Sequence, residues 1–69
     1  MFSYKKFEEL LVKNNISTYR VSKETGLYSP LFSEWKNGKS CPKADKIKIL
    51  ANYFGVTIEY FLEEEKEVV

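Results

Sequence analysis

The sequence predicts an all-α protein consisting of a single small domain. With 69 residues, the chain has room for one hydrophobic core. Its apolar residues recur at the three- and four-residue spacing of helices, and no run of four or more residues alternates as a half-buried strand would. A hydrophobic content of 43%, with 16% aromatic residues, is too apolar for a chain that its charges keep unfolded. We therefore expect five helices packed around one core.

The first helix is expected to start after Ser3, whose hydroxyl can cap it. Asn14 and Asn15 supply the stop signal at its end. The apolar residues between them recur at intervals of three and four and define the buried face: Phe7, Leu10 and Leu11.

A second, short helix is expected between Ser17, a candidate cap, and Thr25. Val21 and the small Ser22 face inward in this helix. Gly26 follows directly and can adopt the left-handed conformation that ends a helix.

The third helix is expected to begin near Pro30. Ser29 can cap it, and proline is well suited to the first helical position because its missing N–H would have no partner there. Asn37 and Gly38 end this helix, and residues 39–42 form a turn in which Pro42 prevents the helix from continuing.

The fourth helix, over residues 43–54, is the clearest amphipathic segment. Its lysines lie on one side and its apolar stripe on the other: Ile47, Leu50, Ala51 and Phe54. Gly55 closes this helix, and Thr57 caps a short last helix. The apolar residues of that last helix are Ile58, Phe61 and Leu62.

The second and third helices, joined by residues 26–28, match a helix-turn-helix. At 100° per residue, Phe32 and Trp35 fall on one side of the third helix and form its buried face. The opposite side would face a DNA major groove. It carries Ser29, Pro30, Ser33, Glu34 and Asn37.

Charge divides the chain into a basic body and an acidic end. The whole chain carries +1, and residues 63–69 carry −3, so residues 1–62 carry +4. We therefore expect a folded domain over residues 1–62 and an acidic tail over residues 63–69. Five lysines and one acid, Asp45, concentrate positive charge between residues 36 and 48. The lysines are Lys36, Lys39, Lys43, Lys46 and Lys48.

Composition argues against an enzyme. The sequence has no His and one Cys, which leaves no Ser/His or Cys/His nucleophile pair and few ways to bind a metal. We expect no cofactor, no metal and no small-molecule substrate. Cys41 cannot form a disulfide within the chain, and the N-terminus lacks the apolar run of a signal peptide. No stretch is apolar enough to cross a membrane, so we expect a cytoplasmic protein.

Three segments together carry a family resemblance: residues 16–27 around the Gly26 turn, residues 32–39 with Trp35-x-Asn37-Gly38-Lys39, and residues 50–62. From Ser3 to Leu62 the chain resembles the lambda-repressor-like helix-turn-helix family, which includes XRE, Cro and phage repressors. The resemblance implies a compact five-helix domain and a transcription regulator. It further implies a repressor of phage or mobile-element type, bound as a homodimer to a double-stranded DNA operator and nucleoid-associated when bound.

The resemblance also assigns site residues. Thr18 matches a position that contacts a phosphate at the start of the second helix, and residues 30–37 match the recognition helix. The positions expected to face bases are Tyr28, Ser29, Pro30, Ser33 and Glu34. The positions expected to grip the DNA backbone are Asn37, Lys39, Ser40 and Lys43.

The chain departs from the family at three places. The first turn of the recognition helix has no Arg, Gln or Lys, so the strongest base pairings are missing and specificity is expected to be weak or indirect. Glu34 could accept from a cytosine amine, and Pro30 or Leu31 could touch a thymine methyl. Leu11 and Lys36 replace a family Arg–Glu pair, which leaves Lys36 free for phosphate. Pro30 shifts the start of the helix and can move the contact register by one residue.

A protein-interaction module on the same fold is the alternative. The small core cannot bury all of Tyr19, Tyr28, Tyr53 and Tyr60, and exposed aromatic side chains favour interfaces with another protein or with a second copy. Removing the charges of Lys36, Lys39 and Lys43 distinguishes the two functions, because a loss of binding would indicate a DNA partner.

Overall fold

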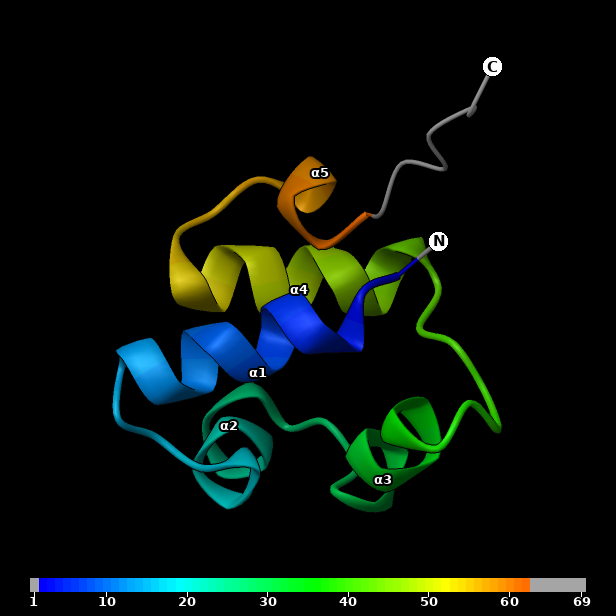
Figure 1. The fold of residues 1–69 in the computed structure, drawn as a ribbon. Helices are drawn as coiled ribbons and strands as arrows, with labels where there is room; N and C mark the ends of the chain where they lie inside the picture. The colour runs from blue at the N-terminus through cyan, green and yellow to red at the C-terminus, as the bar shows by residue number, and fades with distance from the viewer. Residues whose placement is uncertain (1, 63–69) are drawn as a thin grey trace.

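The computed structural model describes residues 2–62 and confirms the all-α prediction (Figure 1). Its five helices are α1 (Tyr4–Lys13), α2 (Thr18–Thr25), α3 (Pro30–Lys36), α4 (Ala44–Phe54) and α5 (Ile58–Phe61). Within residues 2–62 the only β pairing is an isolated antiparallel bridge between Phe2 and Leu62. The expected acidic tail, residues 63–69, lies outside the described residues.

Local capping signals explain most of the helix boundaries. The side chains of Ser3, Ser17 and Thr57 each accept a hydrogen bond from the backbone N–H three residues later, at 3.3, 3.3 and 3.2 Å. Gly26 and Gly55 end α2 and α4 with φ angles of 81° and 71°, a conformation that glycine adopts without steric cost. The predicted caps of these helices are thus confirmed.

Ser29 is the exception, because it does not cap α3 as predicted. It occupies the N-cap position, but its backbone is already helical (φ −59°, ψ −35°) and its side chain makes no capping hydrogen bond. The amides of Leu31 and Phe32 donate instead to the carbonyls of Tyr28 and Ser29, at 3.0 and 3.1 Å. Pro30 favours this tight start because it fixes its own φ and needs no partner for an N–H. The Ser29 hydroxyl is therefore not used as a cap.

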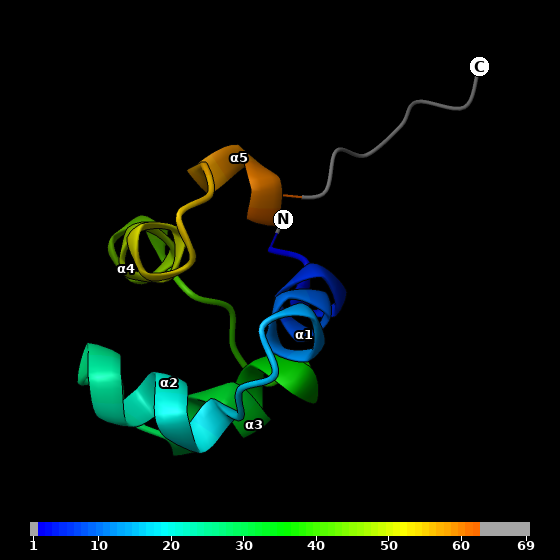
Figure 2. The ribbon, with the colours of Figure 1, turned by 90° about the vertical axis from the view of Figure 1, so that its left-hand side faces the viewer.

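The helices surround a single core, with α1 and α4 on opposite sides of it, the α2–α3 pair below them and α5 above them (Figures 1 and 2). The start of the described chain lies beside its end, because the Ser3 N–H donates to the Phe61 carbonyl at 2.7 Å. Phe2 and Leu62 form their bridge at the same place. These two contacts attach the N-terminal segment to α5.

Side chains from every helix fill the core. Phe32 and Trp35 of α3 are buried, as the helical spacing predicted. Phe54 is only half-buried, whereas the other members of its predicted stripe are buried. Ser22, expected to face inward, is also half-buried, and its hydroxyl donates to the Leu27 carbonyl at 2.5 Å. The buried apolar residues are Phe7, Leu10, Val21, Leu27, Phe32, Trp35, Ile47, Leu50, Ala51 and Phe61.

Phe7 lies at the centre of this core and joins three helices. Its ring stacks on Phe32 with centroids 5.5 Å apart, and it meets Tyr4 and Phe54 edge-on at 5.3 and 6.0 Å. Aromatic pairs in these geometries add to the stabilisation from buried area.

The substitution Phe7→Ala should therefore destabilise the domain severely. We expect a loss of about 3–5 kcal/mol in the free energy of unfolding, because the truncation leaves a cavity between α1, α3 and α4. A domain of this length has a total stability of roughly 3–10 kcal/mol, so much of the variant should be unfolded at 25 °C. Urea titration followed by circular dichroism measures this. Val12→Ala is the control, since Val12 is 81% exposed on α1. Equal stability of the two variants would contradict the assignment of Phe7 as the centre of the core.

Candidate nucleic-acid interface

The turn between α2 and α3 is held by three hydrogen bonds between two small side chains and backbone groups. The Thr25 hydroxyl donates to the Val21 carbonyl at 2.6 Å and accepts from the Leu27 N–H at 3.2 Å. The Ser22 hydroxyl donates to the Leu27 carbonyl, and the Leu27 side chain is buried. With both its backbone groups bonded and its side chain in the core, Leu27 fixes the direction in which α3 leaves the turn.

α3 has one buried side and one exposed side. Phe32 and Trp35 point into the core, and their rings meet edge-on at 5.3 Å. The predicted base-facing side is open to solvent at four positions: Ser29, Pro30, Ser33 and Asn37. Tyr28, just before the helix, is 71% exposed. These five residues are here called the reading face.

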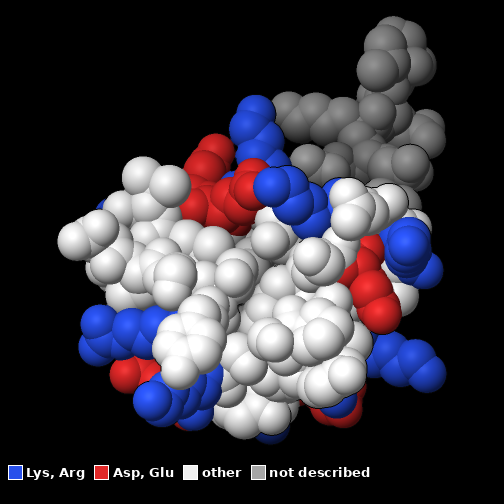
Figure 3. All heavy atoms as spheres, turned by 90° about the horizontal axis from the view of Figure 1, so that it is seen from below, with Lys and Arg blue, Asp and Glu red and all other residues white. Residues whose placement is uncertain are grey.

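The molecular surface on the side of α2 and α3 has an uncharged centre (Figure 3). Lys and Arg side chains lie mainly around the edge of this view, with acidic side chains between some of them. This arrangement suits a surface in which cations meet phosphates at the margin and polar or apolar groups meet bases in the middle.

The loop after α3 is shaped by backbone bonds to the helix. Gly38 has a φ of 74°, and the Lys39 N–H donates to the Glu34 carbonyl at 2.9 Å. Lys39 and Lys43 are exposed, so their ammonium groups are accessible to an anion. The loop thus carries two exposed lysines, Lys39 directly after α3 and Lys43 at the start of α4, and their contact with a DNA backbone stays a prediction.

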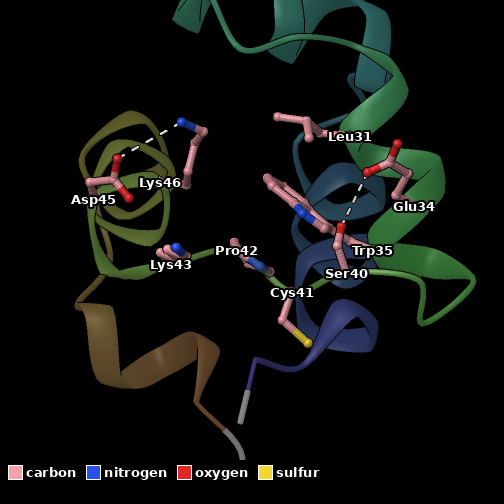
Figure 4. A pocket seen from close by; sticks show the side chains of 9 residues that line it. All are labelled: Leu31, Glu34, Trp35, Ser40, Cys41, Pro42, Lys43, Asp45 and Lys46. Carbon is pink, nitrogen blue, oxygen red and sulfur yellow. Dashed lines mark hydrogen bonds and ion pairs between the residues drawn. The ribbon is translucent and has the colours of Figure 1, made fainter.

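Glu34 and Ser40 bond to each other. Both are half-buried, and the Ser40 hydroxyl donates to Oε1 of Glu34 at 3.2 Å (Figure 4). They line a groove of about 300 Å³ between α3, the loop and α4, in which Leu31 and Trp35 face Lys46 across the gap. One carboxylate oxygen of Glu34, which the sequence predicts to face bases, is therefore hydrogen-bonded within the protein.

Thr18 is the first residue of α2 and is half-buried beside the Ser17 cap. A hydroxyl at this position lies next to backbone N–H groups that no helical carbonyl can satisfy. Contact of Thr18 with a phosphate at the start of α2 stays a prediction.

Lys36 is not free, contrary to the prediction. Its Nζ lies 3.7 Å from Oε2 of Glu8 on α1, in an exposed ion pair. This ion pair joins α1 to the end of α3. Its acidic residue is on α1 and its basic residue is on α3, whereas the family pair has an Arg on the first helix and a Glu on the third. The prediction was wrong because it paired Lys36 with the position of Leu11. The ion pair is instead made by Glu8, which lies one turn earlier on α1. Such exposed pairs contribute about 0–1 kcal/mol.

Sequence reasoning also missed a polar link between α2 and α4. The Tyr53 hydroxyl donates to Oε1 of Glu24, and the Arg20 Nε donates to Oε2 of the same carboxylate at 3.1 Å. Arg20 and Glu24 are four residues apart, a spacing that signals such a pair. Tyr53 lies 29 residues away, and no local signal identifies it. The link attaches the end of α2 to α4.

These bonds shift two pKa values. The hydrogen bond from Tyr53, and then that from Arg20, lower the pKa of the Glu24 carboxyl from its ordinary 4.5. The hydrogen bond to Glu24, followed by desolvation and the charge of Glu24, raises the pKa of the Tyr53 phenol above 10.0. Both shifts favour the state in which a neutral phenol donates to a carboxylate.

The described residues 2–62 hold no cluster of three His, Cys, Asp or Glu side chains that could bind a metal. Cys41 is an exposed free thiol in the loop. None of the helices described is long and apolar enough to cross a membrane.

Tyr53→Phe should raise the pKa of Glu24, because it removes the largest cause of the lowered value while Arg20 remains. A carboxylate with a lowered pKa stabilises the fold above its unfolded-state pKa, and this contribution disappears as the pH falls. A phenol with a raised pKa contributes below 10.0 and loses its contribution as the pH rises. The stability difference between wild type and variant should thus be largest between pH 4.5 and 10.0. Carboxyl carbon NMR titration measures the pKa of Glu24, and an unchanged value would disprove the link.

Comparison with known proteins agrees with this geometry. A family model described as a helix-turn-helix domain matches residues 4–67. No curated protein and no solved structure matches the chain. The matched segment contains the α2–turn–α3 unit and all the helices that support it, which is consistent with the XRE-type resemblance of the sequence. The chain therefore belongs to the helix-turn-helix domain family, whose members use this unit to bind DNA.

Proposed function

We propose that the protein is a sequence-specific DNA-binding transcription regulator that inserts α3 into the major groove. The observation that carries this proposal is the two-sided construction of α3. Phe32 and Trp35 anchor the helix in the core, so its opposite side, with Ser29, Ser33 and Asn37, is left entirely for a partner. The major groove of B-DNA is wide enough to admit an α-helix.

The surrounding residues supply the backbone contacts in this proposal. Lys39 and Lys43 neutralise phosphates on one side of α3, and Thr18 donates to a phosphate at the start of α2. Asn37 and Ser40 belong to the same loop side, with Ser40 supporting the loop through Glu34. Lys36 can reach a phosphate only by leaving Glu8, so its contribution to affinity should be smaller than that of Lys39 or Lys43.

In the finer form of the proposal, the protein is a cytoplasmic repressor of phage or mobile-element type. It binds as a homodimer, because a two-fold operator offers two half-sites one helical turn apart, one for each copy of α3. The sequence resemblance to the lambda-repressor-like family supports this form.

Fluorescence anisotropy tests the function directly. The protein is titrated into the duplex upstream of its own gene and into a scrambled duplex, at about 50 and 200 mM salt. Tighter binding to the native duplex at both salt concentrations is the expected result. Equally weak binding to both duplexes, lost at the higher salt, would mean that the protein binds DNA without sequence specificity. Absence of binding would favour a protein partner, for which the exposed rings of Tyr19 and Tyr28 are the candidate contacts.

The double substitution Lys39→Gln with Lys43→Gln should weaken binding to every duplex by a similar factor. Each lost phosphate contact should reduce the slope of log affinity against log salt by about 1, because one fewer counterion is released. Lys48→Gln is the matched control, since it removes the same charge from an exposed position within α4. If the control lowers the slope as much as one of the loop substitutions, the loop is not the backbone contact.

A further inference from the structure

The reading face contains no cation, and three cations of α2 and α3 have partners within the domain. Arg20 is the only arginine in the sequence, and it is bonded to Glu24 at 3.1 Å. Lys36 pairs with Glu8 at 3.7 Å. The Nζ of Lys23 lies over the ring of Tyr19, 5.8 Å from its centroid. The bidentate Arg contact to guanine, the commonest specific contact in the major groove, therefore has no donor on the reading face.

Recognition of cytosine is limited in the same way. A carboxylate is the side chain that accepts from the cytosine amine, and Glu34 is the one acid in α3. It is half-buried, and its Oε1 already accepts from the Ser40 hydroxyl at 3.2 Å. A base contact that leaves this bond intact would have to use Oε2. The five residues of the reading face thus include neither a cation to pair with guanine nor a carboxylate to pair with cytosine.

The groups that remain exposed are suited to a different pair. Tyr28 offers the carbon edge of its ring, and Pro30 offers the carbons of its own ring in the first turn of α3. Asn37 is the exposed amide at the other end of the helix, and the sequence contains no Gln. Apolar carbon complements the 5-methyl group of thymine, and an Asn amide can pair with N6 and N7 of adenine. The hydroxyls of Ser29 and Ser33 accept or donate to either base.

We infer that this protein recognises A·T base pairs in each half-site, with thymine methyl groups packed against Tyr28 and Pro30 and an adenine bonded by Asn37. The inference depends on the proposed insertion of α3 into the major groove. Seven helical residues span about 10 Å, so one copy of α3 can cover about three base pairs. Recognition therefore rests mainly on methyl contacts, while Lys39 and Lys43 supply most of the affinity.

The test begins by selecting binding duplexes from a random pool with the full chain. In the selected sites, each thymine is then replaced in turn by deoxyuridine, which keeps the base pair and removes only the methyl group. Loss of one buried methyl should weaken binding about fourfold at a contacted position and leave other positions unchanged. Affinities are measured by anisotropy at fixed salt.

Two variants of Tyr28 connect this effect to the protein. In Tyr28→Ala, one thymine position should lose its sensitivity to deoxyuridine, because the ring that contacts the methyl is gone. In Tyr28→Phe, the sensitivity should remain, since the carbon edge is kept. Tyr19→Ala is the matched control, because Tyr19 is 69% exposed, compared with 71% for Tyr28, and belongs to α2. Exposed side chains can be removed with little effect on folding, which circular dichroism verifies.

The possible failures are distinguishable. If no duplex is enriched, the proposed function itself is wrong, and this inference falls with it. If the enriched sites contain G·C pairs at the most restricted positions, the function stands and the inference is overturned. If A·T sites are enriched but deoxyuridine has no effect, the preference arises from DNA shape and the methyl contacts are disproved. Sensitivity that persists in Tyr28→Ala at every position would disprove the role of Tyr28.

Discussion

The stacking of Phe7 on Phe32 is the contact on which the functional surface depends. The two rings lie 5.5 Å apart and within 9° of parallel, and they join α1 directly to α3. A helix of seven residues has no stability of its own in water, because the cost of nucleation exceeds the gain from its few hydrogen bonds. The position of α3 is therefore set by what its buried side contacts. Any change in this stack alters the orientation of the exposed side as well.

The N-terminal segment extends this aromatic contact to the last helix. Phe2 meets Trp35 edge-on at 5.8 Å and lies against Phe61 at 5.7 Å. The Ser3 N–H bonds to the Phe61 carbonyl, so the backbone and the rings act at the same place. The rings of α1, α3 and α5 thus form one continuous cluster. Phe2, two residues before α1, consequently helps to hold α3 in place, although it is 33 residues away from Trp35 in the sequence.

Residues that act through their neighbours in sequence could be predicted, and those that act through distant contacts could not. The spacing of Phe32 and Trp35 identifies the buried side of α3, and Ser3, Ser17 and Thr57 identify helix starts, because capping and periodicity are local. These features account for the fold and for the exposed side of α3.

The errors occurred where a local rule competes with a tertiary contact. Ser29 has the residue type of a cap, but the turn that begins at Tyr28 draws its backbone into the helix. Lys36 has no acid at helical spacing, yet packing of α3 on α1 brings Glu8 to 3.7 Å. Tyr53 meets Glu24 only because α2 and α4 are neighbours. The hydrogen bond between Ser40 and Glu34 likewise forms because the loop after α3 passes back along that helix.

The residues that anchor α3 in the core are different from those proposed to contact bases. This division determines which substitutions would change the DNA sequence that the domain binds. Ser29, Ser33 and Asn37 are exposed, so their side chains contribute little to the core that Phe32 and Trp35 complete. Under the proposed function, substitutions on the reading face would therefore alter base preference at small cost in stability. Glu34 is different, because its bond to Ser40 links a position proposed to face bases to the loop that carries Lys39 and Lys43. In the proposed complex, a change at Glu34 would affect DNA-backbone contacts together with base contacts, whereas a change at Ser33 would affect base contacts alone.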